Sequence, residues 1–232
     1  MSDLKAFIKT QIQELLNEPK MGFEGNELAF LSSQCKNEMQ IRDKIAWRLQ
    51  NIMNQEYGDL YVVRREWSTK ETGRKKVDLA ILEMDSDKIE VARALALIEF
   101  KAQSIARPEP SWYIPEFRKD VKKMRDMIRY CNKCKDADLY FVFLETGQSC
   151  KAEKYKSVLG YAMYQNGTGM VYHGNEEADY LSAVKSHWEA FRNALGENEQ
   201  VTIHEPKAIS IGEAFGYEQF VSPLLIEIDG YN

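Results

Sequence analysis

Two short apolar runs, at residues 77–82 and 94–101, constrain the fold of this chain more than any other feature. Each run is apolar at consecutive positions, a pattern typical of interior strands whose sheet is covered by helices on both faces. Charged residues nevertheless interrupt both runs: Asp78 in the first, and Glu99 and Lys101 in the second. Because a buried charge is costly without a partner, the pattern predicts an α/β fold with a polar site where these strands meet.

The rest of the chain surrounds the two runs with helices and further strands. Helical spacing of apolar residues predicts helices over 4–16, 27–33, 37–54, 116–133 and 179–195, the last capped by Asp179. Runs rich in β-branched and aromatic residues predict strands at 60–67, 139–144, 201–203, 208–211 and 224–228. We expect one structural domain: an N-terminal helical extension (1–36), a core (37–146) and a C-terminal part packed on the core (147–232).

Composition narrows the class of protein. Hydrophobic residues make up 44% of the 232 residues and charged residues 29%, which is typical of a globular chain. No apolar run is long enough to span a bilayer and no signal peptide is visible, so we expect a cytoplasmic protein without membrane contact. The net charge of −5 counts against a nucleic-acid partner. A nuclease partly escapes this objection, because its metal site concentrates carboxylates.

The spacing of Asp78, Glu99 and Lys101 predicts how these residues lie relative to one another in the sheet. Glu99 and Lys101 are two residues apart, so they lie on one face, which Leu95 and Leu97 should continue into the core. If Asp78 stands opposite Glu99 in an antiparallel pair, the turn is centred at (78 + 99)/2 = 88.5. That position falls within 85–90, the turn-like stretch between the two runs. The sequence therefore predicts that Asp78, Glu99 and Lys101 lie together.

Two neighbouring carboxylates repel each other unless a cation lies between them. A hard divalent ion with oxygen ligands suits such a site, and Mg²⁺ fits best, since it keeps several waters and binds one or two carboxylates. We expect Asp78, Glu99 and the backbone carbonyl of Phe100 to bind Mg²⁺ together with a phosphate oxygen. Lys101 would stabilise the charge that develops on the phosphate and orient the attacking water.

The motif Val77-Asp78, twenty residues, Glu99-Phe100-Lys101 resembles that of the PD-(D/E)xK nucleases, with Val77 in place of the proline. The resemblance covers residues 37 to 145 and implies a restriction endonuclease-like core in the order α-β-β-β-α-β, a mixed central sheet flanked by helices. It also implies a glutamate on the first core helix near the metal, a position that Glu38 matches. The implied activity is Mg²⁺-dependent hydrolysis of DNA, with Mn²⁺ as a substitute ion; RNA stays an alternative substrate, and DNA is favoured because most relatives cut DNA. A restriction-type endonuclease is the first expectation, and a homodimer is one expected arrangement because many relatives cut two strands.

Basic residues next to the expected site are candidates for contacts with the phosphate backbone. Those on the first hairpin are Arg64, Arg65, Arg74, Lys75 and Lys76, and Lys122 represents the polar side of the helix at 116–133, where a solvated face is an equal alternative. Trp112 and Tyr113 would either stack on a base or, more in keeping with aromatic side chains, anchor their loop to the core. The rival interpretation is a non-catalytic module with a nuclease-like fold that binds nucleic acid or protein.

Overall fold

A computed structural model describes residues 2–34, 37–73, 75–104, 113–148, 177–195 and 201–229. Five α-helices, two 3-10 helices and seven strands lie in these ranges. In chain order they are α1 (Ser2–Asn17), α2 (Glu27–Gln34), α3 (Glu38–Tyr57), η1 (Gly58–Leu60), β1 (Tyr61–Ser68), β2 (Lys76–Met84), β3 (Val91–Ser104), α4 (Ile114–Tyr130), η3 (Asn132–Cys134), β4 (Asp138–Gln148), α5 (Glu177–Leu195), β5 (Val201–Ile203), β6 (Ile209–Ala214) and β7 (Tyr217–Ile228).

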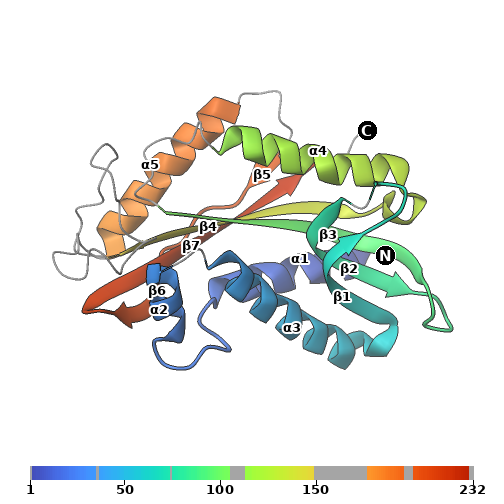
Figure 1. Cartoon of the computed structure of the whole chain (residues 1–232), viewed down its shortest axis with the longest axis horizontal. Coiled ribbons are helices and arrows are strands. Elements are labelled where there is room, and N and C mark those ends of the chain that lie inside the picture. Colours follow the sequence, from blue (N-terminus) through green and yellow to red (C-terminus); the bar gives the residue numbers. More distant parts are fainter. Residues whose placement is uncertain are drawn as a thin grey trace.

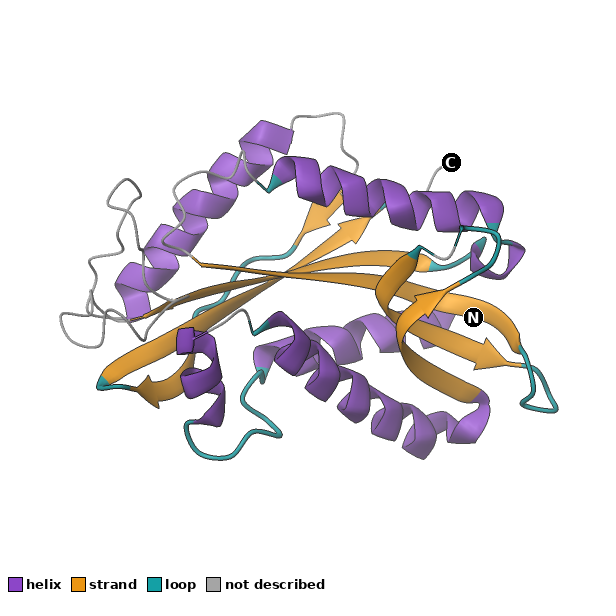
Figure 2. Cartoon of the chain, in the orientation of Figure 1, coloured by secondary structure: helices purple, strands orange, loops and turns teal. Residues whose placement is uncertain are grey.

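The seven strands form one mixed sheet. Its order is β1-β2-β3-β4-β7-β5, and β6 also pairs with β7. The β3–β4 pair is parallel and is connected through α4, whereas the other pairs are antiparallel. The helices α4 and α5 lie over one face, and α1, α2 and α3 lie over the other (Figures 1 and 2). The predicted α/β class, with a mixed sheet flanked by helices, is confirmed.

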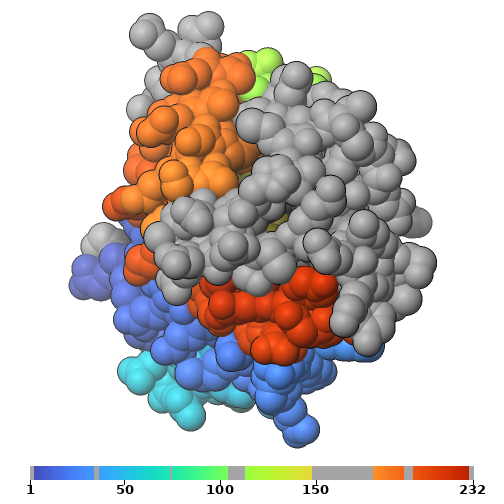
Figure 3. Space-filling view, turned by 90° about the vertical axis from the view of Figure 1, so that its left-hand side faces the viewer, coloured from blue at the N-terminus to red at the C-terminus, as the bar shows by residue number. Residues whose placement is uncertain are grey.

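Each face of the sheet has its own hydrophobic core, which is why the interior strands are apolar at consecutive positions. On the α4 and α5 face, Phe117 and Phe191 pack against Phe141 and Phe143 of β4. On the other face, helices α1 and α3 bury their apolar stripes against β2, β3 and β4. Seen from one end of the sheet, α5 and the N-terminal helices lie on opposite sides of the segment that contains β6 and β7 (Figure 3).

Several element boundaries differ from those predicted. Helix α5 begins at Glu177, so Asp179 lies inside the helix and does not cap it. Helix α4 ends at Tyr130 because Cys131 adopts an extended backbone, with φ −113° and ψ 112°, before η3 begins. Strand β7 has twelve residues and starts well before the predicted strand at 224–228, because its residues 219–228 pair with β4 and its first residues pair with β6. None of the helices in the described ranges is both long and apolar enough to cross a membrane.

The predicted register of β2 and β3 is confirmed near the charged residues. Leu79 pairs with Ile98, and their numbers sum to 177, as 78 and 99 do. Nearer the turn the sum falls to 176 and then to 175, for the Met84–Val91 pair, because β3 contains two register shifts. The turn therefore spans 85–90, as predicted, with its centre moved by one residue.

The first register shift corrects one prediction. Ile81 pairs with Ala96 and Leu82 with Ala94, which leaves Leu95 as the extra residue of a β-bulge. Leu95 consequently packs in the core beneath α1 and α3, whereas Leu97 packs beneath α4. The prediction that Leu95 and Leu97 share one face was wrong.

We expect the substitution Phe117→Ala to destabilise the fold by about 3–5 kcal/mol, the usual effect of removing a buried aromatic side chain. Phe117 is fully buried, with ring centroids 5.0 Å from Phe141 and 5.6 Å from Phe191. Urea denaturation followed by circular dichroism measures the change. The control is Tyr130→Ala on the same helix, where the side chain is 56% exposed and the expected change is within about 0.5 kcal/mol. Equal stability of the two variants would contradict this assignment of the core.

Candidate active site

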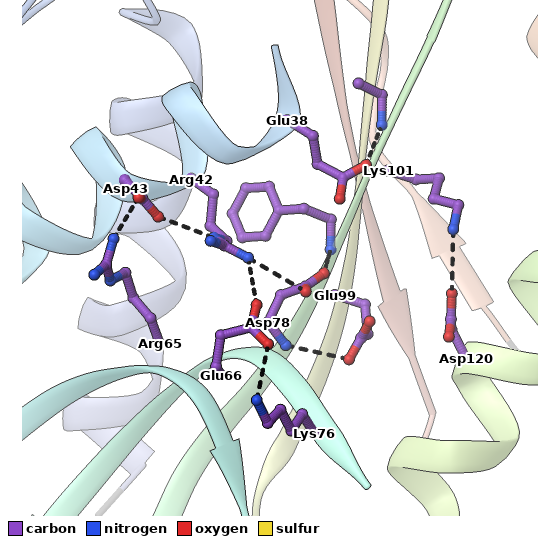
Figure 4. Close-up of polar contacts among 12 residues, drawn as sticks. Glu38, Arg42, Asp43, Arg65, Glu66, Lys76, Asp78, Glu99, Lys101 and Asp120 are labelled. Atoms are coloured by element: carbon purple, nitrogen blue, oxygen red, sulfur yellow. Dashed lines mark hydrogen bonds and ion pairs between the residues drawn. The ribbon is translucent and has the colours of Figure 1, made fainter. Parts of the chain in front are cut away.

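The site forms where β3 extends beyond the ladder that it makes with β2. That ladder ends at the Leu79–Ile98 pair, while β3 continues to Ser104 and pairs there only with β4 among the described strands. Two carboxylates accept the backbone N–H groups along this open edge. Asp78 Oδ2 accepts from Phe100 N at 2.8 Å, and Glu38 Oε2 accepts from Ala102 N at 2.9 Å (Figure 4). The edge of β3 thereby brings together acids from β2 and α3.

Asp78 and Glu99 lie side by side, as the register requires. The backbone N–H of Asp78 donates to Glu99 Oε1 at 3.3 Å. This N–H is available because the β1–β2 ladder skips one pair: Arg65 pairs with Leu79 and Trp67 with Val77, but Glu66 and Asp78 do not pair. Glu66 has a left-handed backbone with φ 51°, which is unusual for a residue with a side chain. Such strain is often found at functional sites.

Glu99 is the buried member of the acidic pair. Only 3% of its surface is exposed. Burial, and next the negative charge of Asp78, raise the pKa of Glu99 to about 8, although Lys123 opposes this increase. Lys123 Nζ lies 2.7 Å from Glu99 Oε1. The carboxyl group of Glu99 is therefore poised to change protonation near neutral pH, and an additional cation would favour its charged form.

Arg42 on α3 is the counterion of Asp78. Its guanidinium is 7% exposed, and Nη1 lies 3.5 Å from Asp78 Oδ1 and 2.8 Å from Glu66 Oε1. Its Nε donates to Asp43 Oδ1 at 3.0 Å. Arg42 thus joins the acid on β2 to the strained residue of β1 and to its own helix, and Figure 4 shows these contacts converging on its side chain.

Lys101 lies at the site but is directed towards α4. Its Nζ is 3.2 Å from Glu116 Oε2 and 3.9 Å from Asp120 Oδ2. Asp120 Oδ1 is also 3.3 Å from Lys123 Nζ, so one carboxylate joins the two lysines. Burial lowers the pKa of Lys101, but the neighbouring carboxylates, Glu116 first, outweigh this effect and raise it, so the amine remains charged.

Sequence reasoning missed three of these residues: Arg42, Lys123 and Asp120. The sequence contained a signal for Asp120 and Lys123 on α4. Together with Glu116 they are spaced i, i+4 and i+7, so the three residues lie along one stripe of the helix. That stripe borders the buried one and faces the open edge of β3. Arg42 follows Glu38 by four residues on α3, again one helical turn.

The predicted phosphate-binding residues lie around the site with different partners. Arg64 is exposed on β1, and Arg65 forms an ion pair with Asp43. Lys75 Nζ is 3.2 Å from Asp126 on α4, and Lys76 Nζ is 3.9 Å from Glu66. Lys122 is exposed on α4, and the neighbouring Lys123 is the lysine that contacts Glu99.

Two residues named in the predictions, Arg74 and Trp112, lie outside the described residues. Tyr113 is 3% exposed, and its ring centroid lies 6.4 Å from that of Phe143. It therefore packs in the core, as an anchor of its loop would.

The oxygen atoms of the site suit a hard cation. Asp78 and Glu99 supply two carboxylates, and the Phe100 carbonyl points to the same edge as its N–H, because both groups of a strand residue face the same neighbour. Among the described residues, no three His, Cys, Asp or Glu side chains form a group that could hold a metal ion. Mg²⁺ needs fewer, since one or two carboxylates and several waters complete its shell. Asp78 Oδ1 and Oδ2 have one contact each and keep a lone pair for a cation, whereas Glu99 Oε1 already faces both Asp78 N and Lys123 Nζ, which leaves Oε2 as the oxygen of Glu99 suited to a cation.

Comparison with protein-family models, with curated proteins and with solved structures finds no match for this chain. Inference about its function therefore depends on the geometry and charges of the site.

We expect Glu99→Gln to stabilise the protein increasingly as the pH rises from 5 to 9 without added metal. The pKa of about 8 in the folded state lies above the ordinary 4.5. The stability that Glu99 contributes is therefore fully present below pH 4.5 and is lost as the pH rises through 8, whereas glutamine does not ionise.

Thermal unfolding of both proteins in a chelator-containing buffer, followed across this pH range, measures the effect. The control is Glu56→Gln, which removes an exposed carboxylate on the same helix as Arg42, and the Tm difference for Glu99→Gln should change with pH by more than that of the control. A change for Glu99→Gln no larger than that of the control would show that Glu99 ionises normally.

Proposed function

We propose that this chain is a Mg²⁺-dependent nuclease that hydrolyses DNA phosphodiesters, with the segment from α3 to β4 as a restriction endonuclease-like core. The element order α3-β1-β2-β3-α4-β4 supports the core assignment. The observation that carries the proposal is the β2–β3 register, which places Asp78 beside Glu99 at an open strand edge, with Lys101 two residues further along. A restriction-type endonuclease is the preferred form of this activity.

In this proposal, Asp78, Glu99 and the Phe100 carbonyl hold the Mg²⁺. When bound, the ion polarises the phosphodiester and lowers the pKa of a coordinated water. Glu38 fixes the edge of β3 through the N–H of Ala102, and the proposal assigns it the role of an outer ligand.

The lysines have a separate role. Lys101 and Lys123 place two positive charges along the α4 side of the same edge, and the Asp120 carboxylate lies between their ammonium groups and contacts both. A compact ammonium ion stabilises the charge that develops on a phosphoryl group in the transition state. The ordered pairing with α4 preorganises both amines before substrate arrives.

A non-catalytic module is the second candidate, because the acids already have cationic partners. Arg42 lies 3.5 Å from Asp78, and Lys123 lies 2.7 Å from Glu99. Such a charge-balanced site would be stable without metal. The two candidates differ in cation binding and in cleavage, which are measured separately.

Titration calorimetry with Mn²⁺ tests cation binding independently of activity. We expect Asp78→Asn and Glu99→Gln each to weaken binding by roughly tenfold or more, since each removes one charged ligand. The control is Asp87→Asn, in the exposed turn between β2 and β3, which should bind Mn²⁺ as the parent does. Equal binding by all four proteins would place the ion elsewhere.

Cleavage of plasmid and of single-stranded DNA tests the activity. With Mg²⁺ or Mn²⁺ we expect the parent protein to cut, and Lys101→Ala or Asp78→Asn to reduce the rate by about 10²–10³-fold, the usual effect of removing a group that stabilises transition-state charge. The control is Lys135→Ala, an exposed lysine after η3. Cleavage that survives Lys101→Ala would remove the assignment of that residue. DNA binding by the parent without cleavage would favour the non-catalytic module.

A further inference from the structure

A groove runs between α3 and the edge strand β1, beside the candidate active site. Its volume is about 610 Å³, within the range of ligand-binding clefts. Gln50 fixes its floor by bonding to β1 twice: its side-chain amide donates to the Tyr61 carbonyl at 2.9 Å and accepts from Val63 N at 2.7 Å. The groove is therefore formed before any ligand arrives. Its lining residues are Arg42, Asp43, Ala46, Trp47, Gln50, Val63, Arg64, Arg65 and Glu66.

Trp47 is the unusual member of this lining. Its side chain is 66% exposed, although α3 has a well-buried stripe on its opposite side. Exposing a large aromatic ring is unfavourable in water unless a partner covers it. A flat ring at the wall of a polar groove is suited to stacking on another flat, unsaturated ring.

The charge of the groove is opposite in sign to that of the chain. Three arginines and two acids line it, giving 3 − 2 = +1, whereas the whole chain has a net charge of −5. Arg64 makes no ion pair with any residue in the described ranges, and Arg65 is anchored by Asp43. Arg64 is therefore placed to meet an anion at the groove that the exposed indole ring also lines.

Arg42 links the groove to the acidic site. Its side chain lines the groove and also lies 3.5 Å from Asp78 Oδ1. A ligand in the groove would thus be one side chain away from the proposed metal ligand.

From these observations we infer that the α3–β1 groove binds single-stranded DNA, with Trp47 stacking on an unpaired base and the exposed Arg64 and Arg65 facing the adjacent phosphates. This inference rests on the proposed nuclease function and specifies an unpaired strand as its substrate, in place of the duplex that a restriction-type enzyme would cut. The indole needs a free base face, which a stacked duplex does not offer. Arg64 and Arg65 would contact the anionic backbone of the strand, and Arg42 links the groove to Asp78.

Fluorescence anisotropy of a labelled twenty-residue oligothymidine, in chelator so that no cleavage occurs, tests the inference. We expect the single strand to bind more tightly than a duplex of the same length. Trp47→Ala should weaken single-strand binding by about 5- to 150-fold, the range that one base–aromatic stack provides. Trp47→Phe should recover most of the loss, and Arg64→Gln should reduce the dependence of binding on salt concentration.

The matched control is Tyr130→Ala, which removes an aromatic ring that is 56% exposed on α4, across the sheet from the groove. Duplex binding equal to single-strand binding would overturn the inference, as would a Trp47→Ala effect no larger than that of Tyr130→Ala. The absence of any oligonucleotide binding would overturn it too, and would leave the exposed indole as a contact for a protein. Cleavage is assayed separately from binding. Cleavage without binding that depends on Trp47 would contradict the groove inference alone, whereas binding that depends on Trp47 without cleavage would contradict the nuclease proposal alone.

Discussion

Electrostatic repulsion between Asp78 and Glu99 is the constraint on which the arrangement of this site depends. The β2–β3 register forces the two carboxylates together, and the core beneath α4 keeps Glu99 from water. Each acid consequently has its own cation from a helix: Arg42 from α3 and Lys123 from α4. The two helices that cover opposite faces of the sheet are thus joined electrostatically through the same pair of strands.

The same constraint explains why the site lies at a strand edge. Carboxylates beside an open ladder accept backbone N–H groups that would otherwise lack partners, as those of Phe100 and Ala102 do. The acids therefore complete the hydrogen bonding of β3 at its open edge. Asp78 and Glu38 hold the strand edge and also belong to the proposed metal site. A substitution at either residue would therefore affect both the local structure and the proposed chemistry.

Much of this framework was predictable from sequence, because strand pairing follows simple arithmetic. Consecutive apolar residues identified the interior strands. A single turn between them fixed the register that places Asp78 beside Glu99. The bulge at Leu95 was not predictable in the same way. It depends on how side chains pack in the two hydrophobic cores. Its effect is to turn Leu95 to the opposite face of the sheet while the register near the site is preserved.

The cationic partners were missed because long-range contacts between helices and strands leave only weak traces in one sequence. Lys122 and Lys123 are adjacent, and only the rotation of α4 about its axis decides which of them reaches Glu99. The helix is rotated by its buried residues, Phe117, Val121 and Met124, whose packing against β4 is a tertiary property. Arg42 likewise reads as an ordinary surface arginine until α3 is placed against β1.

The position of β7 has a consequence for how the chain reaches this structure. Strand β4 is paired on one side with β3 and on the other with β7, and Tyr217 follows Gln148 by 69 residues. During synthesis at the ribosome, β4 therefore emerges with one side unpaired and with aromatic residues on its surface, long before its second neighbour exists. Contacts of such large sequence separation slow folding and expose the nascent chain to aggregation, so we expect this protein to depend on chaperones more than a helical protein of equal length does.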